Sequence, residues 1–74
     1  SQQFLHFLGT AYLLAGDFAR SAEAYRKRIA LSPRTDLSRA FLASALGHLG
    51  DVEGARKVWG ELREINPTYS FAHH

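Results

Sequence analysis

The stretch FLHFLGTAYLLAGD, residues 4–17, returns in related form as SRAFLASALGHLGD, residues 38–51. Both stretches contain a Phe-Leu pair at the same place and end in Gly-Asp. The second stretch follows the first at the same interval that separates the two prolines of the chain, Pro33 and Pro67. A fixed period of roughly 20–50 residues is typical of stacked-repeat proteins. We therefore expect two copies of one structural unit.

Each copy has the pattern of two helices joined by a short turn. Apolar residues recur at helical spacing in four segments, at about residues 2–15, 18–32, 36–49 and 52–66. Between the helices of each copy stands a Gly-Asp pair, in which glycine favours a helix stop and aspartate an N-cap. Either Thr35 or Asp36 caps the third helix. No segment has the pattern of a strand, so the sequence predicts an all-α fold.

The residues at key positions match a known repeat pattern. The first copy supplies Leu5, Leu8, Gly9, Tyr12, Ser21, Tyr25 and Pro33, and the second Arg39, Leu42, Ala43, Leu46, Ala55, Trp59 and Pro67. In this spacing the chain resembles the tetratricopeptide repeat, a helix–turn–helix unit of about 34 residues. Arg39 departs from the pattern, since the family has a large apolar residue there. Gly47, Gly54 and Gly60 are expected to weaken the helices of the second copy.

The resemblance implies an α-solenoid of tandem antiparallel hairpins, with repeats at residues 2–35 and 36–69. Within the repeat, Gly9 and Ala43 would be small because two helices approach closely there. Residues 70–74 are interpreted as the start of a truncated capping helix or as a tag remnant.

Composition narrows the class of protein. The chain has 74 residues, a formal net charge of +2 and no cysteine, so disulfides and thiolate metal sites are excluded. The charge is too small and too dispersed for a nucleic-acid interface. No apolar run has the length of a membrane span, and we expect a cytoplasmic protein. We find no catalytic constellation and no set of metal ligands at suitable spacing, so we expect no enzyme, metal or cofactor.

The resemblance also implies where a partner binds, because the first helix of each family hairpin lines a concave groove. The corresponding residues here are His6, Phe7, Thr10, Leu14, Leu37, Phe41, Ser44 and His48. Phe7, Leu14, Leu37 and Phe41 would be the apolar anchors, although Phe7 and Phe41 would also suit plain packing between hairpins. The lysine, arginine and asparagine cluster with which some family members hold a carboxylate is missing. The expected partner is therefore an apolar or amphipathic protein segment.

Two other interpretations stay open. The end of the repeat stack would expose Val58, Trp59, Leu62 and Ile65, and two copies of the chain would then form a homodimer through this face. Alternatively, the segment is an accessory, regulatory part of a larger multidomain signalling enzyme.

Overall fold

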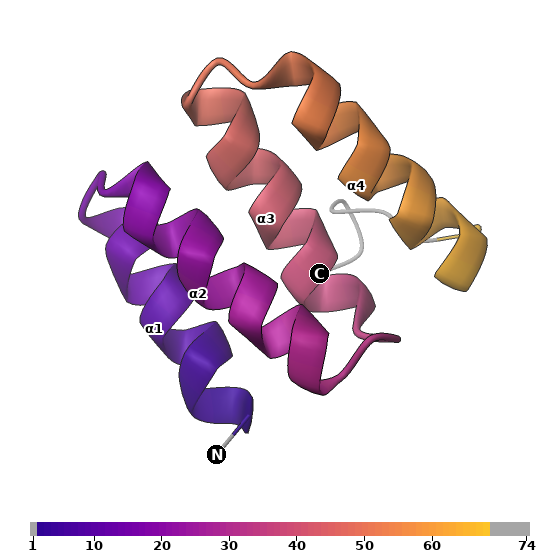
Figure 1. Ribbon diagram of the computed structural model, residues 1–74, viewed down its shortest axis with the longest axis horizontal. Coiled ribbons are helices and arrows are strands. Elements are labelled where there is room, and N and C mark those ends of the chain that lie inside the picture. Colours follow the sequence, from indigo (N-terminus) through magenta and orange to yellow (C-terminus); the bar gives the residue numbers. More distant parts are fainter. Residues whose placement is uncertain (1, 69–74) are drawn as a thin grey trace.

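The computed structural model describes residues 2–68 and contains four α-helices, with no strand in that range. They are α1 (Gln2–Leu14), α2 (Phe18–Leu31), α3 (Asp36–His48) and α4 (Val52–Ile65). In Figure 1 the helices follow one another across the molecule, and each packs against the next. The predicted all-α fold is confirmed. The prediction of a truncated capping helix or tag remnant concerns residues 70–74, which lie outside the described residues.

The helix ends have local causes that were readable in the sequence. Gly16 and Gly50 adopt φ values of +83° and +84°, a region that residues with a Cβ atom rarely enter. Directly after them, the carboxylates of Asp17 and Asp51 accept hydrogen bonds from backbone N–H groups in the first turns of α2 and α4. At α3 the choice left open by the sequence falls on Thr35, which is the N-cap.

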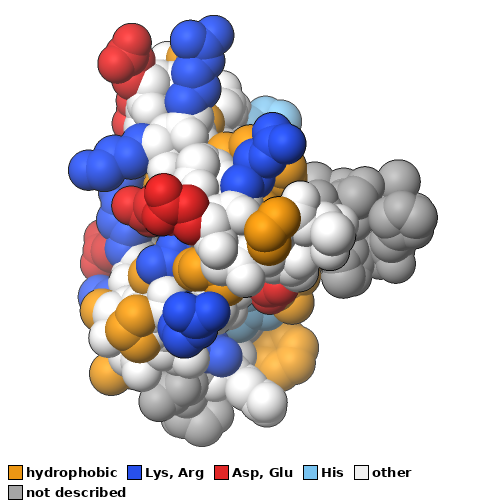
Figure 2. Space-filling model, turned by 90° about the vertical axis from the view of Figure 1, so that its right-hand side faces the viewer, with side chains coloured by type: hydrophobic (Ala, Val, Ile, Leu, Met, Phe, Trp, Pro, Cys, Tyr) orange, Lys and Arg blue, Asp and Glu red, His pale blue; other side chains and the backbone are white. Residues whose placement is uncertain are grey.

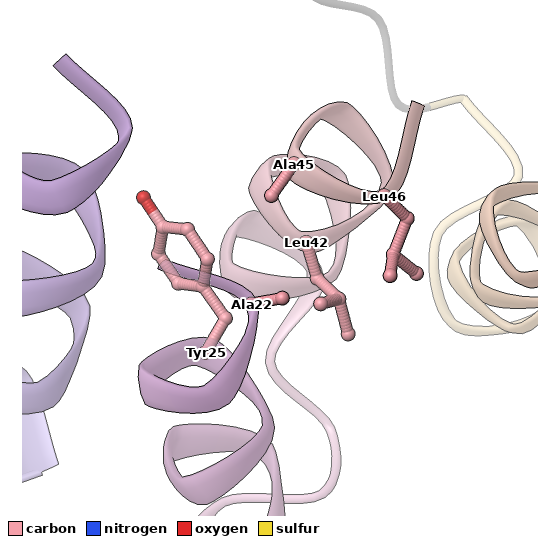
Figure 3. Close-up of a cluster of buried hydrophobic side chains, with 5 residues drawn as sticks. All are labelled: Ala22, Tyr25, Leu42, Ala45 and Leu46. Atoms are coloured by element: carbon pink, nitrogen blue, oxygen red, sulfur yellow. The ribbon is translucent and has the colours of Figure 1, made fainter. Parts of the chain in front are cut away.

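The central core lies where α2 packs against α3. Ala22 and Tyr25 from α2 meet Leu42, Ala45 and Leu46 from α3, and Figure 3 shows Ala22 and Leu42 pointing toward each other. All five side chains are buried. Burying one leucine stabilises the fold by about 1.5–3 kcal/mol relative to leaving it exposed. The contact between the first and the second helix pair is therefore part of one continuous core.

Small residues let α1 and α2 approach closely. Gly9 presents its backbone to α2, and the hydroxyl of Ser21 donates a hydrogen bond to the carbonyl oxygen of Gly9 over 2.8 Å. Ser21 is completely buried, so this bond satisfies a polar group that would otherwise be costly.

Arg39, the departure from the repeat pattern, is buried and has specific partners. Its guanidinium donates hydrogen bonds to the carbonyl oxygens of Pro33 and Thr35, and its Nε lies 3.3 Å from a carboxylate oxygen of Glu61. The side chain thereby connects α3 with α4 and with the loop that precedes α3.

Candidate functional site

The eight predicted groove residues belong to α1 and α3 but do not line one cavity. Phe7 and Leu37, together with His6, line a cavity of about 360 Å³ at the start of α3. Ser44 lines a different crevice, between α3 and α4. Near the other end of the helices, Leu14 is largely exposed and His48 stacks on Phe18 with ring centroids 4.4 Å apart. The predicted set is thus divided among separate surfaces.

Phe41 occupies the contact between the two helix pairs. Its ring lies edge-on to the ring of Tyr25 at 5.9 Å and at 5.2 Å from that of His6. The side chain is half-buried and packs against the central core. Phe41 therefore joins the two pairs of helices, and only part of it is accessible to a partner.

Two polar residues of the predicted groove, His6 and Thr10, are held within the fold by hydrogen bonds. His6 Nδ1 lies 2.9 Å from the Ser38 hydroxyl, and the Thr10 hydroxyl donates to the His6 carbonyl oxygen over 3.0 Å. Since Thr10 uses its proton there, the phenol of Tyr25 donates to Thr10 at 2.8 Å. Burial lowers the pKa of His6, and the positive charge of Arg28 lowers it further. Burial also raises the pKa of Tyr25, against the opposite effect of its hydroxyl hydrogen bonds.

The predicted self-association face needs one correction. Leu62 is fully buried (0% exposed) and belongs to the interior of the protein rather than to an open face. Val58 packs against the central core from the outside. Trp59, in contrast, lines the crevice between α3 and α4. Helix α4 is therefore rotated so that Leu62 lies in the interior and Trp59 in the crevice, although the sequence pattern predicted both on one exposed face.

That crevice is the largest hollow among the described cavities, with a volume of about 580 Å³. Its lining comes from α3 (Ala40, Ala43, Ser44, Gly47) and from α4 (Val52, Ala55, Arg56, Trp59, Gly60, Arg63). Small residues leave the hollow open: a Cβ atom added at Gly47 or Gly60 would meet no atom within 4 Å apart from the neighbouring backbone of its own helix. Figure 2 views the molecule from the α4 side, where charged side chains gather along one edge with hydrophobic ones between them.

This crevice was not predicted from the sequence, although small residues on α3 indicate it. Ala40, Ala43 and Gly47 recur at helical spacing on α3. The chemistry that the lining offers is mainly apolar packing. Arg56 and Arg63 are exposed, and among the described lining residues Ser44 alone carries a hydroxyl group. Such a surface suits the apolar face of another helix.

Residues 2–68 contain neither a metal-binding cluster nor a helix that could span a membrane. No group of three or more histidine, aspartate or glutamate side chains in this range is arranged to hold a metal ion. None of its helices has the length and apolar character needed to cross a lipid bilayer. No protein-family model matches the chain, and no curated protein matches it.

Proposed function

We propose that the chain is a non-catalytic protein–protein interaction module that holds an amphipathic helix of a partner in the crevice between α3 and α4. The proposal combines the resemblance to tetratricopeptide repeats, and with it an α-solenoid architecture, with the shape of this crevice. A cytoplasmic location is part of the proposal and rests on the sequence alone.

One observation carries the proposal. Helix α3 packs against the α1/α2 pair and contributes Leu42, Ala45 and Leu46 to the central core. The α3/α4 pair presents an apolar crevice with no described helix in it. Because α1/α2 and α3/α4 share their sequence pattern, a helix with the apolar spacing of α3 is the natural occupant. A preformed crevice also reduces the entropy cost of binding.

The cavity lined by Phe7 and Leu37 extends the proposal to part of the predicted groove. Phe7 is 68% exposed, so its ring is available to an apolar segment that runs along α1 and α3.

The test uses a synthetic peptide with the sequence of α3, residues 36–48, added to the intact chain at low protein concentration. Trp59 is the only tryptophan and lines the crevice, so its fluorescence reports occupancy. We expect a saturable blue shift of its emission, since the bound helix excludes water from the ring. A peptide with Leu42→Glu serves as the control and should leave the emission unchanged.

A variant of the protein sharpens the result. Gly47→Glu places a carboxylate in the open space of the crevice and, because glutamate favours helix over glycine, should not weaken α3. Gly47→Ala is the matched change without charge. Equal binding of the α3 peptide to the Gly47→Glu and Gly47→Ala proteins would overturn the proposed site.

A further inference from the structure

The two halves of the described chain are related by a constant shift in numbering, the one that carries Gly16 onto Gly50. The same shift carries both ends of α1 (Gln2–Leu14) onto those of α3 (Asp36–His48), and both ends of α2 onto those of α4. We call it the repeat shift. Each contact between α3 and the first helix pair therefore has an equivalent contact that two copies of the chain could make. The residue on α3 is shifted back onto α1 of one copy, and the residue on the first pair is shifted forward onto α3 or α4 of the other copy.

One side of that equivalent junction is the outer face of α1. Among the residues of α3 that contact the first pair, Ser38 lies against His6, Phe41 against Tyr25, and His48 against Phe18. Their counterparts on α1 are Phe4, Phe7 and Leu14. These side chains are 60%, 68% and 84% exposed, so the face of α1 that matches the docking face of α3 is apolar and open.

The other side is the α3/α4 crevice. The counterparts of His6, Phe18 and Tyr25 are Ala40, Val52 and Trp59, and all three line the crevice. Val52 is itself 54% exposed. The repeat shift thus pairs Phe4 with Ala40, Phe7 with Trp59, and Leu14 with Val52. Every pair is apolar. Four of the large hydrophobic residues exposed on the protein belong to these pairs, namely Phe4, Phe7, Leu14 and Val52.

We infer that the crevice of one copy receives helix α1 of a second copy, so that the chains associate head to tail. The inference rests on the proposed function, since it names a second copy of the chain as the source of the bound helix. The contact is heterologous: two different surfaces meet, and association extends into a row or closes into a ring. It differs from the two-fold homodimer expected from the sequence, in which identical faces would meet.

Two arginines that line the crevice limit the strength of the contact between copies. Arg56 and Arg63 stand where the first helix pair has Ala22 and Ile29. Ala22 is buried in the central core, and Ile29 packs against it. Exposed arginines at these two positions put charge where the internal contact has apolar side chains, so the contact between copies should be weaker than the internal contact that it resembles.

Sedimentation equilibrium with two complementary variants tests the inference. Leu14→Glu puts a charge on the α1 face and leaves the crevice intact, whereas Gly47→Glu blocks the crevice and leaves α1 intact. For the unchanged chain we expect an average mass that rises with concentration beyond that of a dimer. Each variant alone should be monomeric, and an equimolar mixture should form a 1:1 dimer that grows no further. Circular dichroism would verify that both variants keep their helices.

Two results would overturn head-to-tail association. One is a monomeric unchanged chain at every concentration, and the other is a Leu14→Glu protein that still dimerises, as a two-fold contact between crevices would allow. The proposed function is tested separately in the Leu14→Glu protein. If the α3 peptide still shifts its Trp59 emission, helix binding by the crevice stands although self-association fails.

Discussion

The ring of Tyr25 lies directly against the backbone of Gly9. A Cβ atom at Gly9 would stand 2.7 Å from Cε1 of that ring, closer than real Cβ contacts allow. Tyr25 is completely buried and its ring also contacts those of His6 and Phe41, so it has little room to move. Gly9 on α1 therefore determines the position of the Tyr25 ring, which belongs to the central core.

This contact predicts that two glycine-to-alanine substitutions, at Gly9 and at Gly47, change the free energy of unfolding in opposite directions. Gly9→Ala should lower the free energy of unfolding by about 1–3 kcal/mol, because the new methyl group overpacks a closed site. Gly47→Ala should raise it by about 0.5–1 kcal/mol, because the added methyl meets open space and alanine favours helix. Urea denaturation followed by circular dichroism measures both. If the two variants were equally stable, the Gly9–Tyr25 contact would not be as tight as described.

Much of the fold was predictable because its causes are local. The turn glycines, Gly16 and Gly50, and the capping aspartates act on their immediate neighbours in the chain, so they mark helix ends in the sequence itself. The close approach at Gly9 was also expected from the repeat pattern. The family resemblance, the repeat boundaries and the identity of a partner stay predictions.

The orientation of α4 and the burial of Arg39 could not be predicted, because they depend on contacts between residues far apart in the sequence. Trp59 and Leu62 are neighbours on one apolar stripe of α4, yet one lines the crevice and the other is buried. The packing of α4 against α3 sets that rotation, and periodicity alone does not reveal it. Arg39 is similar: its partner Glu61 lies on another helix, far along the chain, so the sequence offered no reason to bury a charge there.

The contacts of Arg39 predict which of its partners matters most. Arg39→Met keeps the apolar stem but removes the bonds to two carbonyl oxygens and to Glu61, and should cost about 1.5–3 kcal/mol of stability. Glu61→Gln should cost about 1 kcal/mol or less, because the Glu61 side chain is 46% exposed and Arg39 retains its carbonyl partners. Chemical denaturation of both variants makes the comparison. A Glu61→Gln loss as large as that of Arg39→Met would show instead that the ion pair dominates.

The lowered pKa of His6 predicts how the free energy of unfolding changes with pH. Burial first, and the charge of Arg28 second, lower its pKa from the ordinary value of 6.5, which applies to the unfolded chain. Below that value the unfolded chain therefore binds more protons at this site than the folded protein does. The free energy of unfolding should consequently decrease as the pH falls from neutral through 6.5 toward the lowered pKa of His6, and the effect is absent above this range. His6→Gln removes the titrating group and should flatten the profile there, whereas His48→Gln leaves His6 in place and should keep the slope. Urea denaturation at a series of pH values provides the comparison, and an unchanged slope in His6→Gln would assign the effect to another group.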